Sequence, residues 1–259
     1  MVHMHVCETK GQFLQGQKLF GCTPVAHLER IGVLNDRLSM AHCVWLTNED
    51  IERVAAHGTT VIHNPASNGK LGSGTMPFGE MLRRNVRLGL ATDGSGSNDT
   101  QNMFEALRLA GIVHNRNDRD YHEWPAPDQV LRAATSGSAY ALGLGGRLGM
   151  IEQGSMADFV LLSMNSYPFV PLNDVVRQIV YCENGVSVRD VMIDGRWVMR
   201  DGKILTIDEP TLYERARAAR SEMDERVREQ LQRTSELEPA LRATYLGTTG
   251  VQWSERDSN

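Results

Sequence analysis

Short apolar stretches with a strand-like pattern alternate with longer stretches of helical pattern along the first half of the chain. Residues 2–8 (VHMHVCE) alternate with a period of two, as a half-buried strand does. Three further strands are predicted at residues 38–45, 59–65 and 87–93. Helices are predicted between and after them, at residues 23–34, 47–58, 78–86, 102–116 and 126–144. Strands that alternate with helical crossovers form a parallel sheet, so the pattern indicates an α/β fold.

Capping residues support two of these helices. Thr23 occupies an N-cap position with Pro24 at the first helical position, and Thr47 precedes a helix that has Asp50 in its first turn. Gly58 is placed to end that second helix, because glycine adopts the left-handed conformation of a helix C-terminus without strain. Both helix starts are therefore predicted from local signals alone.

The pattern changes after about residue 150. Short strands are predicted at residues 154–164, 177–185 and 188–205, and the two Asp-Gly pairs of IDGRWVMRDGKIL are typical of hairpin turns. From Pro210 onward the sequence predicts a charged amphipathic helix. We expect its apolar face to pack on the α/β part of the chain or on a second subunit. That face carries Leu212, Ala216, Ala219, Met223, Val227 and Leu231.

Composition and charge exclude several classes of protein. The net charge of −5 gives no basis for binding nucleic acid or anionic membranes, which requires clustered basic residues. No apolar run approaches the ~18 residues of a membrane-spanning helix. The cysteines lack a C-x-x-C pair, which is typical of reduced thiols in a cytoplasmic protein. They are Cys7, Cys22, Cys43 and Cys182. We therefore expect a cytoplasmic protein without nucleic-acid or membrane partners.

Histidine and carboxylate side chains occur where the predicted strands end. The first strand delivers His5 and, just beyond its end, Glu8; the second delivers His42, the third His63 and the fourth Asp93. In a parallel α/β barrel, functional residues lie at the C-terminal ends of the strands. A single strand-end histidine is usually a core residue. Four successive strand ends with ligating or titratable groups instead indicate a divalent-metal site with an acid–base group beside it.

Two further patterns concern the surroundings of this site. Alternation along the first strand predicts that His3, His5 and Cys7 share the inner face of the sheet, while the intervening apolar residues face the helices. Residues 68–74 (NGKLGSG) and 93–99 (DGSGSND) are rich in glycine and serine but lack the spacing of a phosphate-binding loop. They are predicted to be loops at the rim of a pocket.

The motifs HVCET, AHCVWLTNEDI, HNPASNGKLGSG, ATDGSGSND and GSMADFVLL, in this order, resemble the second half of the metal-dependent amidohydrolase superfamily. The resemblance runs from Val2 to about Leu205. It points to the branch that contains triazine hydrolases, methylthioadenosine/S-adenosylhomocysteine deaminases and guanine- or cytosine-type deaminases. It implies that residues 1–150 form strands five to eight of a TIM-like (β/α)8 barrel. Residues 151–207 would form the C-terminal part of a small β-sandwich, and residues 208–259 a C-terminal helical extension.

Carried over by position, the resemblance implies roles for the strand-end residues. His5 would be a metal ligand at the end of strand five. Asp93 would bind the metal and help to deprotonate its water. Glu8, in the H-x-x-E pattern, would shuttle protons and contact the substrate, and His42 would orient the hydroxide or polarise the scissile group.

The remaining polar residues are assigned by the same resemblance. Ser97 and Asn98 would border the substrate, whereas His63 lies where the family does not normally place a ligand and would be structural or would support the ligands from behind. His3 and His5 form an H-x-H pattern, but the H-x-x-E that follows matches strand five and not the metal-binding pair of strand one. His3 would therefore pack one layer below the site.

The resemblance implies hydrolysis of carbon–nitrogen bonds other than peptide bonds. The expected reaction is deamination of a purine, pyrimidine or triazine type of heterocycle by a metal-bound hydroxide, with Zn²⁺ as the expected metal and Fe²⁺ as the alternative. Glu8 favours deamination, because ammonia must be protonated to leave. Dechlorination or dealkylation of a triazine is the alternative reaction. The expected partner is a small heterocyclic substrate, and a homo-oligomer is also considered.

Only His5 and Asp93 of the four expected metal ligands are matched in this chain, because strands one to four have no counterpart in it. We therefore expect a fragment, a miscalled gene start or half of a split enzyme, with weak metal binding and little activity alone. A non-catalytic interpretation is also open. The chain would then associate with a separate N-terminal half, or with itself, through the open edge of the half-barrel.

Overall fold

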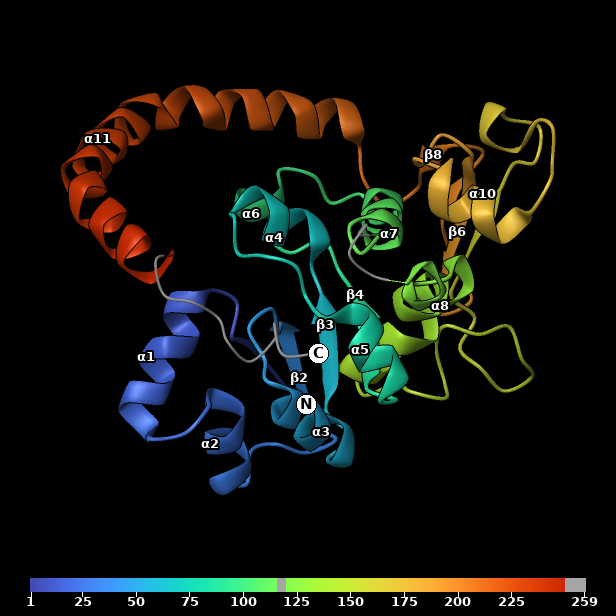
Figure 1. Ribbon diagram of the computed structural model, residues 1–259. Coiled ribbons are helices and arrows are strands. Elements are labelled where there is room, and N and C mark those ends of the chain that lie inside the picture. Colours follow the sequence, from blue (N-terminus) through green and yellow to red (C-terminus); the bar gives the residue numbers. More distant parts are fainter. Residues whose placement is uncertain (116–119, 250–259) are drawn as a thin grey trace.

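The first sheet is parallel, as predicted, in a computed structural model that describes residues 1–115 and 120–249. Its strands lie in the order β1-β2-β3-β4. Their bounds are β1 (Val2–Val6), β2 (Leu38–His42), β3 (Thr60–His63) and β4 (Arg87–Leu90). The strands lie side by side at the centre of the first part of the molecule (Figure 1). Their register aligns the ends of β1 and β2, since Val6 pairs with His42.

The two faces of this sheet differ in chemistry. One row of paired residues, Met4, Met40, Val61 and Leu88, belongs to the hydrophobic core beneath the helices. The next row along the strands faces the other side and holds His5, Ala41, Ile62 and Gly89. The helices that accompany the strands are α1 (Lys10–Phe20), α2 (Pro24–Arg30), α3 (Asn48–Ala56), α4 (Pro65–Lys70), α5 (Phe78–Arg83), α6 (Ser95–Asn98), α7 (Met103–Ile112), α8 (Pro127–Arg132) and α9 (Ser138–Ala141).

The predicted caps are confirmed. Thr23 accepts a hydrogen bond from the Ala26 N–H at the start of α2, and Thr47 and Asp50 form a reciprocal capping box on α3. The Thr23 hydroxyl also donates to the Asp50 carboxylate, so one buried acidic side chain connects the starts of both helices. Burial raises the pKa of Asp50, while its hydrogen bonds to the two threonines lower it.

Several local predictions are wrong. Helix α1 was not predicted, because its sequence KGQFLQGQKLF contains two glycines and gives a weak helical pattern. Helix α6 lies in a segment that was predicted as a loop, and α4 begins at the last residue of a predicted strand and runs into the other predicted loop. Cys7 does not share the inner face with His5: β1 ends at Val6, and Cys7 has a φ of 50°, which places its side chain in the core.

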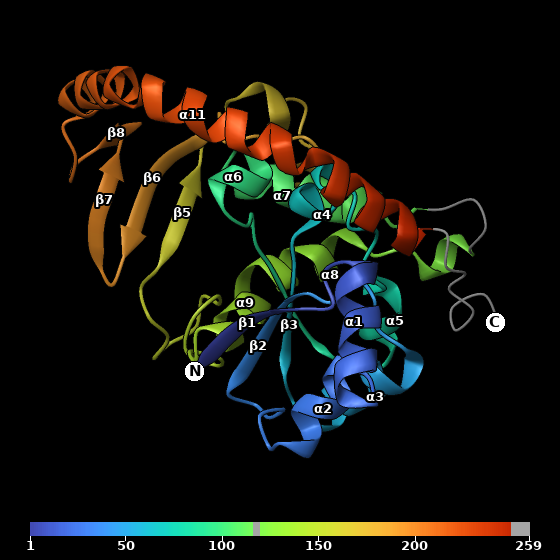
Figure 2. The same cartoon turned by 90° about the vertical axis from the view of Figure 1, so that its left-hand side faces the viewer.

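The second sheet is antiparallel, as the hairpin signals predict. It contains β5 (Phe159–Leu162), β6 (Val188–Ile193), β7 (Arg196–Arg200) and β8 (Lys203–Ile204), and Figure 2 shows it beside the first sheet. Both Asp-Gly turns have positive φ at each central residue, as type I′ turns require. Three short helical turns also occur. Two are 3₁₀ turns, at Tyr121–Glu123 and Tyr167–Phe169, and one is a π turn, at Ala133–Gly137.

Residues 177–185 were predicted as a strand, and this is wrong. They belong largely to helix α10 (Val175–Tyr181), whose N-cap Asp174 accepts from the Arg177 N–H. A short apolar run does not distinguish a strand from a buried helix. Here the N-cap Asp174 favours the helix. Helix α10 packs against α7 and α8, and Gly111 in α7 gives the Tyr181 ring space for this close approach.

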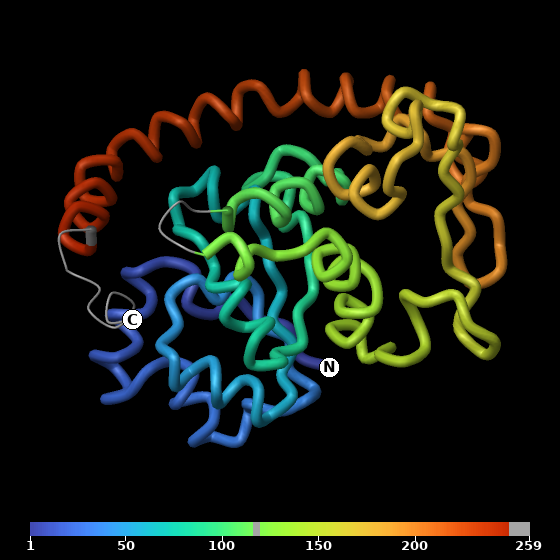
Figure 3. Tube along the Cα trace, turned by 45° about the vertical axis from the view of Figure 1, so that its right-hand side comes forward, coloured from blue at the N-terminus to red at the C-terminus, as the bar shows by residue number. Residues whose placement is uncertain are grey.

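The amphipathic helix predicted from Pro210 onward is confirmed as α11 (Glu209–Thr249). Figures 1 and 3 show it running from the second sheet across the molecule towards α1, where Thr248 approaches Gly11. The expectation that its apolar face packs on the α/β part is wrong, because Leu212, Met223 and Leu231 are 47%, 51% and 64% exposed. The alternative, packing on a second subunit, stays a prediction.

The two edge strands of the first sheet differ. At the β4 edge, the Ser138 hydroxyl accepts from the Leu90 N–H and donates to the Leu90 carbonyl oxygen. Gly137 lies so close to β4 that an added Cβ would be 2.0 Å from the Leu88 carbonyl oxygen. On the other side of the sheet, β1 pairs with β2 alone among the residues that the structure describes. The start of α9 therefore covers the β4 edge, and β1 is the open one.

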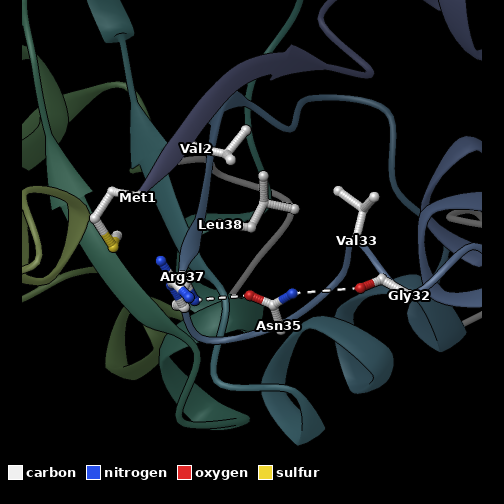
Figure 4. Close-up of a pocket in the computed structure, with 7 residues that line it drawn as sticks. All are labelled: Met1, Val2, Gly32, Val33, Asn35, Arg37 and Leu38. Carbon is white, nitrogen blue, oxygen red and sulfur yellow. Dashed lines mark hydrogen bonds between the residues drawn. The ribbon is translucent and has the colours of Figure 1, made fainter.

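A pocket of about 270 Å³ lies beside the first residues of β1 and β2 (Figure 4). Met1, Val2, Leu38 and Arg37 are among its lining residues. It lies at the ends of these strands where the chain enters the sheet, which is opposite to the ends that carry His5 and His42. In an α/β barrel this end serves stability and not chemistry.

Candidate metal centre

Three side chains that the sequence placed on different strand ends converge in the structure. His5 lies on β1, His42 ends β2, and Asp93 follows β4. The Nε2 atom of His42 is 3.3 Å from Nδ1 of His5 and 3.9 Å from Oδ2 of Asp93. One potential ligand atom from each residue lies within 4.8 Å of the others. Two imidazoles and a carboxylate therefore meet at one point at the C-terminal end of the sheet.

Unusual backbone angles bring two of these side chains to the inner face. His42 pairs with Val6, whose side chain is in the core, so regular alternation would direct His42 towards the helices. Its φ of 72° redirects the side chain next to His5. Asp93 has a φ of 65° and also leaves the extended conformation. Residues other than glycine rarely adopt such angles, and they cluster at functional sites.

Glu8 lies beside this cluster. Its Oε2 is 3.7 Å from His42 Nε2, and its side chain is 22% exposed, compared with 1% for His42. The Ser73 hydroxyl donates to Glu8 Oε1 over 3.4 Å, and the Glu8 N–H donates to Gln12 Oε1 over 2.7 Å. The carboxylate therefore adjoins the cluster and reaches the solvent-accessible side, where a substrate would approach.

Two adjacent residues of α4 support the cluster from behind. The Ser67 hydroxyl donates to Asp93 Oδ2 over 2.6 Å, and Asn68 Oδ1 lies 2.9 Å from His42 Nδ1. The Gly94 N–H donates to Asp93 Oδ1 over 2.7 Å. Burial alone would raise the pKa of Asp93. The hydrogen bonds from Ser67 and Gly94 and the nearby imidazoles instead hold this pKa below its usual value. The carboxylate is thus kept ionised, as a metal ligand must be.

His63 lies away from the cluster, in agreement with its predicted structural role. It is fully buried on the helix side of the sheet, where its Nε2 is 3.1 Å from Nε2 of His114 and its ring contacts Phe78. Burial lowers the pKa of His63, and the neighbouring His114 lowers it further. Burial also lowers the pKa of His114, to about 4.

Three further residues were assigned roles from the sequence, namely His3, Ser97 and Asn98. His3 occupies the inner face below His5 and hydrogen-bonds Ser39 Oγ over 2.7 Å, as expected of a packing residue. Ser97 and Asn98 are in α6, directly after the Asp93 strand end. The Asn98 amide donates to the Thr92 carbonyl oxygen over 2.7 Å and so supports the backbone before Asp93. Substrate contact by these two residues stays a prediction.

The donor set fits a borderline divalent cation. Imidazole nitrogens combined with one carboxylate are the ligands of catalytic Zn²⁺ sites, and non-haem Fe²⁺ accepts the same set. Mg²⁺ and Ca²⁺ prefer oxygen ligands alone. His42 was predicted to act on the hydroxide and not on the metal, yet its Nε2 is close enough to the other two donors to belong to the same cluster.

The family assignment rests on residues 1–198, which match the model of the amidohydrolase family. The chain belongs to this family. It is 37% identical over 223 residues to a 5'-deoxyadenosine deaminase from Methanothermobacter thermautotrophicus, covering 86% of this chain and 52% of the relative. It is 39% identical over 215 residues to a 5-methylthioadenosine/S-adenosylhomocysteine deaminase from Desulforudis audaxviator, covering 83% and 50%.

Solved structures agree with this assignment. An adenosine deaminase from Xanthomonas campestris with bound zinc superposes with a TM-score of 0.82 at 36% identity, covering 86% of this chain and 50% of that one. Atrazine chlorohydrolase from Arthrobacter aurescens TC1, complexed with zinc, gives a TM-score of 0.77 at 29% identity, with 83% and 48% covered. The chain therefore has the amidohydrolase fold over a C-terminal portion and spans about half the length of the relatives it matches.

Two contributors to the site were missed by sequence reasoning, namely Ser67 and Asn68. Ser67 lies between the strand predicted at residues 59–65 and the loop predicted at residues 68–74, and Asn68 is the first residue of that loop. The signal that could have found them is Pro65, a residue that favours the first turn of a helix, directly after the third strand.

No helix within residues 1–115 and 120–249 combines the length and apolarity needed to cross a membrane.

Proposed function

We propose that this chain carries one half of the active site of a metal-dependent hydrolase that deaminates an N-heterocycle of purine, pyrimidine or triazine type. The observation that carries the proposal is the convergence of His5, His42 and Asp93, with Glu8 3.7 Å from His42. The deaminases among the relatives support the choice of reaction.

His5 and Asp93 would hold the cation, for which Zn²⁺ is preferred and Fe²⁺ is the alternative. Two of the solved relatives are described with zinc, which supports this choice. A divalent cation supplies acidity, since it lowers the pKa of water from 15.7 to about 7. His42, at 1% exposure, is held rigidly by its neighbours and would orient the attacking water.

Glu8 would be the acid–base group. It is not part of the three-residue cluster and is partly accessible, so it can accept a proton from the attacking water and pass it to the ring nitrogen and then to the departing ammonia. Such a general acid–base role contributes roughly 10²–10⁴-fold to rate. Ser97 and Asn98 would contact the substrate from α6.

A second candidate reaction is hydrolytic dechlorination or dealkylation of a triazine, which the similarity to atrazine chlorohydrolase supports. Chloride leaves without a proton, so dechlorination does not depend on an acid at the position of Glu8, whereas loss of an alkylamine requires a proton as loss of ammonia does. A non-catalytic role is the third candidate. It is supported by the open edge of β1, through which the chain would associate with a separate N-terminal half or with a second copy.

The metal assignment is tested by zinc titration of the purified chain. Asp93→Asn and His5→Gln should each weaken Zn²⁺ binding at least tenfold. Asp36→Asn, which removes an exposed carboxylate elsewhere, should leave it unchanged. Because only His5 and Asp93 are assigned to the cation here and a catalytic zinc site normally has three protein ligands, the unaltered chain should itself bind only weakly. Zinc binding that survives both ligand substitutions would refute the assignment.

The reaction is tested in a chimera. This chain would replace the matching C-terminal half of the Methanothermobacter relative, and ammonia release would be followed with adenosine-type, guanine-type and triazine-type substrates. We expect turnover that falls at least 10²-fold in Glu8→Gln. Chloride release that is unaffected by Glu8→Gln would instead favour dechlorination. A chimera that unfolds cooperatively on heating, binds zinc and turns over no substrate would count against both reactions.

A further inference from the structure

Ser67 and Asn68 are neighbours in the chain, and each contacts a different member of the cluster. Ser67 reaches Asp93, and Asn68 reaches His42, over 2.6 and 2.9 Å respectively. Both residues are buried, with exposed fractions of 0% and 2%. Polar side chains at this depth require partners, and here the partners are the groups that form the candidate metal centre.

The position of α4 explains how two adjacent residues reach two different strands. Helix α4 follows β3, and β3 lies between β2 and β4 in the sheet. Successive residues of a helix point about 100° apart. From one helical turn above β3, Ser67 can therefore reach the end of β4 on one side, while Asn68 reaches the end of β2 on the other.

The Asn68 contact determines which ring nitrogen of His42 carries the proton. A neutral imidazole has one N–H and one unprotonated nitrogen. Because Asn68 presents its carbonyl oxygen Oδ1 to His42 Nδ1, the proton must be on Nδ1. Nε2 is then unprotonated, and this is the atom that faces His5, Glu8 and Asp93.

We propose that Ser67 and Asn68 are the positioning residues of the site: Asn68 fixes His42 in the Nδ1–H tautomer with an unprotonated Nε2 facing the cluster, and Ser67 fixes the rotation of the Asp93 carboxylate. The inference deepens the proposed function, and it decides between the two roles considered for His42. Polarising a scissile group requires an Nε2–H donor. An unprotonated Nε2 accepts a hydrogen bond from water or binds the cation directly.

The side-chain amide of Asn68 has a second possible orientation, which would reverse the tautomer of His42. Its Nδ2 finds no hydrogen-bond partner among the residues that the structure describes. Rotation of the amide by 180° would direct Nδ2 at His42 and would place the proton on Nε2 instead. One orientation of the Asn68 amide leaves His42 Nε2 unprotonated and the other places a proton on it, so an experiment can distinguish them.

The experiment is ¹⁵N NMR of the histidine rings in the metal-free chain at pH 8.5, well above the ordinary pKa of about 6.5 for an imidazole in a model peptide. The His42 signals are identified by their loss in His42→Gln. His57 serves as an internal reference, since its Nδ1 lies 2.9 Å from the Arg53 carbonyl oxygen, which can only accept. We expect His42 to show the same Nδ1–H pattern as His57. An Nε2–H pattern in the unaltered chain would overturn the assignment.

Substitutions at residue 68 separate positioning from packing. Asn68→Asp retains an acceptor and should keep His42 in the Nδ1–H tautomer. Asn68→Ala removes the acceptor and should convert much of the population to Nε2–H, with His57 unchanged. A His42 pattern that is identical in the alanine variant and the unaltered chain would refute the role of Asn68. If that variant does not fold, the spectrum of the unaltered chain still decides the tautomer.

Ser67 is tested by zinc affinity, because supporting hydrogen bonds typically contribute 10–100-fold to metal binding. Ser67→Ala should weaken binding by that factor, and Ser67→Thr should restore most of it. Ser187→Ala is the matched control, since Ser187 is also buried and hydrogen-bonded but lies far from the cluster in sequence, in the turn directly before β6. Equal affinities in all three variants would refute the role of Ser67. Absence of zinc binding in the unaltered chain would count against the proposed function, while the tautomer measurement would stand.

Discussion

The contact between His63, which is buried, and His114, which is half-buried, should make the stability of this chain sensitive to mild acid. In the folded chain both histidines have lowered pKa values, chiefly because of burial. In the unfolded chain they return to about 6.5. A group with a lowered folded pKa contributes its full stability above its unfolded pKa. That contribution is lost as the pH falls from 6.5 towards the folded value, because the unfolded state binds protons first.

The magnitude follows from the lowered pKa of His114. With pKa values of about 4 in the folded chain and 6.5 in the unfolded chain, the free energy of unfolding should fall by about 2 kcal/mol between pH 7 and pH 5 from this residue alone. His114→Gln removes the titrating group and keeps an N–H donor for His63. The variant should therefore lose about 2 kcal/mol less stability over this interval.

The assay is urea unfolding followed by circular dichroism at pH 7 and pH 5, with the same buffer and ionic strength. His122→Gln is the matched control, because His122 is exposed and should change the pH dependence little. If His114→Gln and the control lose stability equally between the two pH values, the explanation from this histidine pair is refuted. A folded chain that is more stable at pH 5 than at pH 7 would reverse the predicted sign.

Three further predictions concern packing and reactivity. Asp50→Ala should lower the free energy of unfolding by about 2 kcal/mol, because it leaves the buried hydrogen-bonding groups at two helix starts unpaired; urea unfolding measures this. Gly137→Ala should cost at least about 2 kcal/mol in the same assay, because its Cβ would overlap a backbone carbonyl oxygen of β4. Gly69→Ala, where nothing lies within 4 Å, should instead be neutral or stabilising, and equal effects at the two glycines would contradict the steric argument. At pH 8, an alkylating reagent should modify the exposed Cys182 and leave Cys7 unmodified until the chain unfolds, since burial raises the pKa of Cys7; mass spectrometry reports the order.

Local signals were sufficient for much of the fold. The period-two pattern of β1, the threonine caps of α2 and α3 and the Asp-Gly turns of the second sheet each depend on residues that are close in sequence. The wrong predictions arose where the local pattern was weak or ambiguous. Helix α1 has two glycines and is stabilised by a cap at each end, and α10 contains an apolar run that fits either a strand or a helix.

The candidate site was partly accessible to sequence reasoning. The predicted strand order and parallel topology are sufficient to place four residues at one end of the sheet: His5, Glu8, His42 and Asp93. The left-handed turn at His42 could not be predicted, because no local pattern distinguishes it from the end of an ordinary strand. The contacts of Ser67 and Asn68 each span 26 residues and depend on where α4 lies relative to its neighbours.

The covered edge of β4 has a consequence for how copies of this chain meet. Two sheets of this kind could in principle join β1 of one molecule to β4 of the next, and repetition of that contact would build an endless fibre. The Ser138 hydroxyl occupies the Leu90 groups that such a contact requires. Strand addition to the first sheet is therefore restricted to the β1 side, and an assembly that joins β1 of one molecule to β1 of another ends at two.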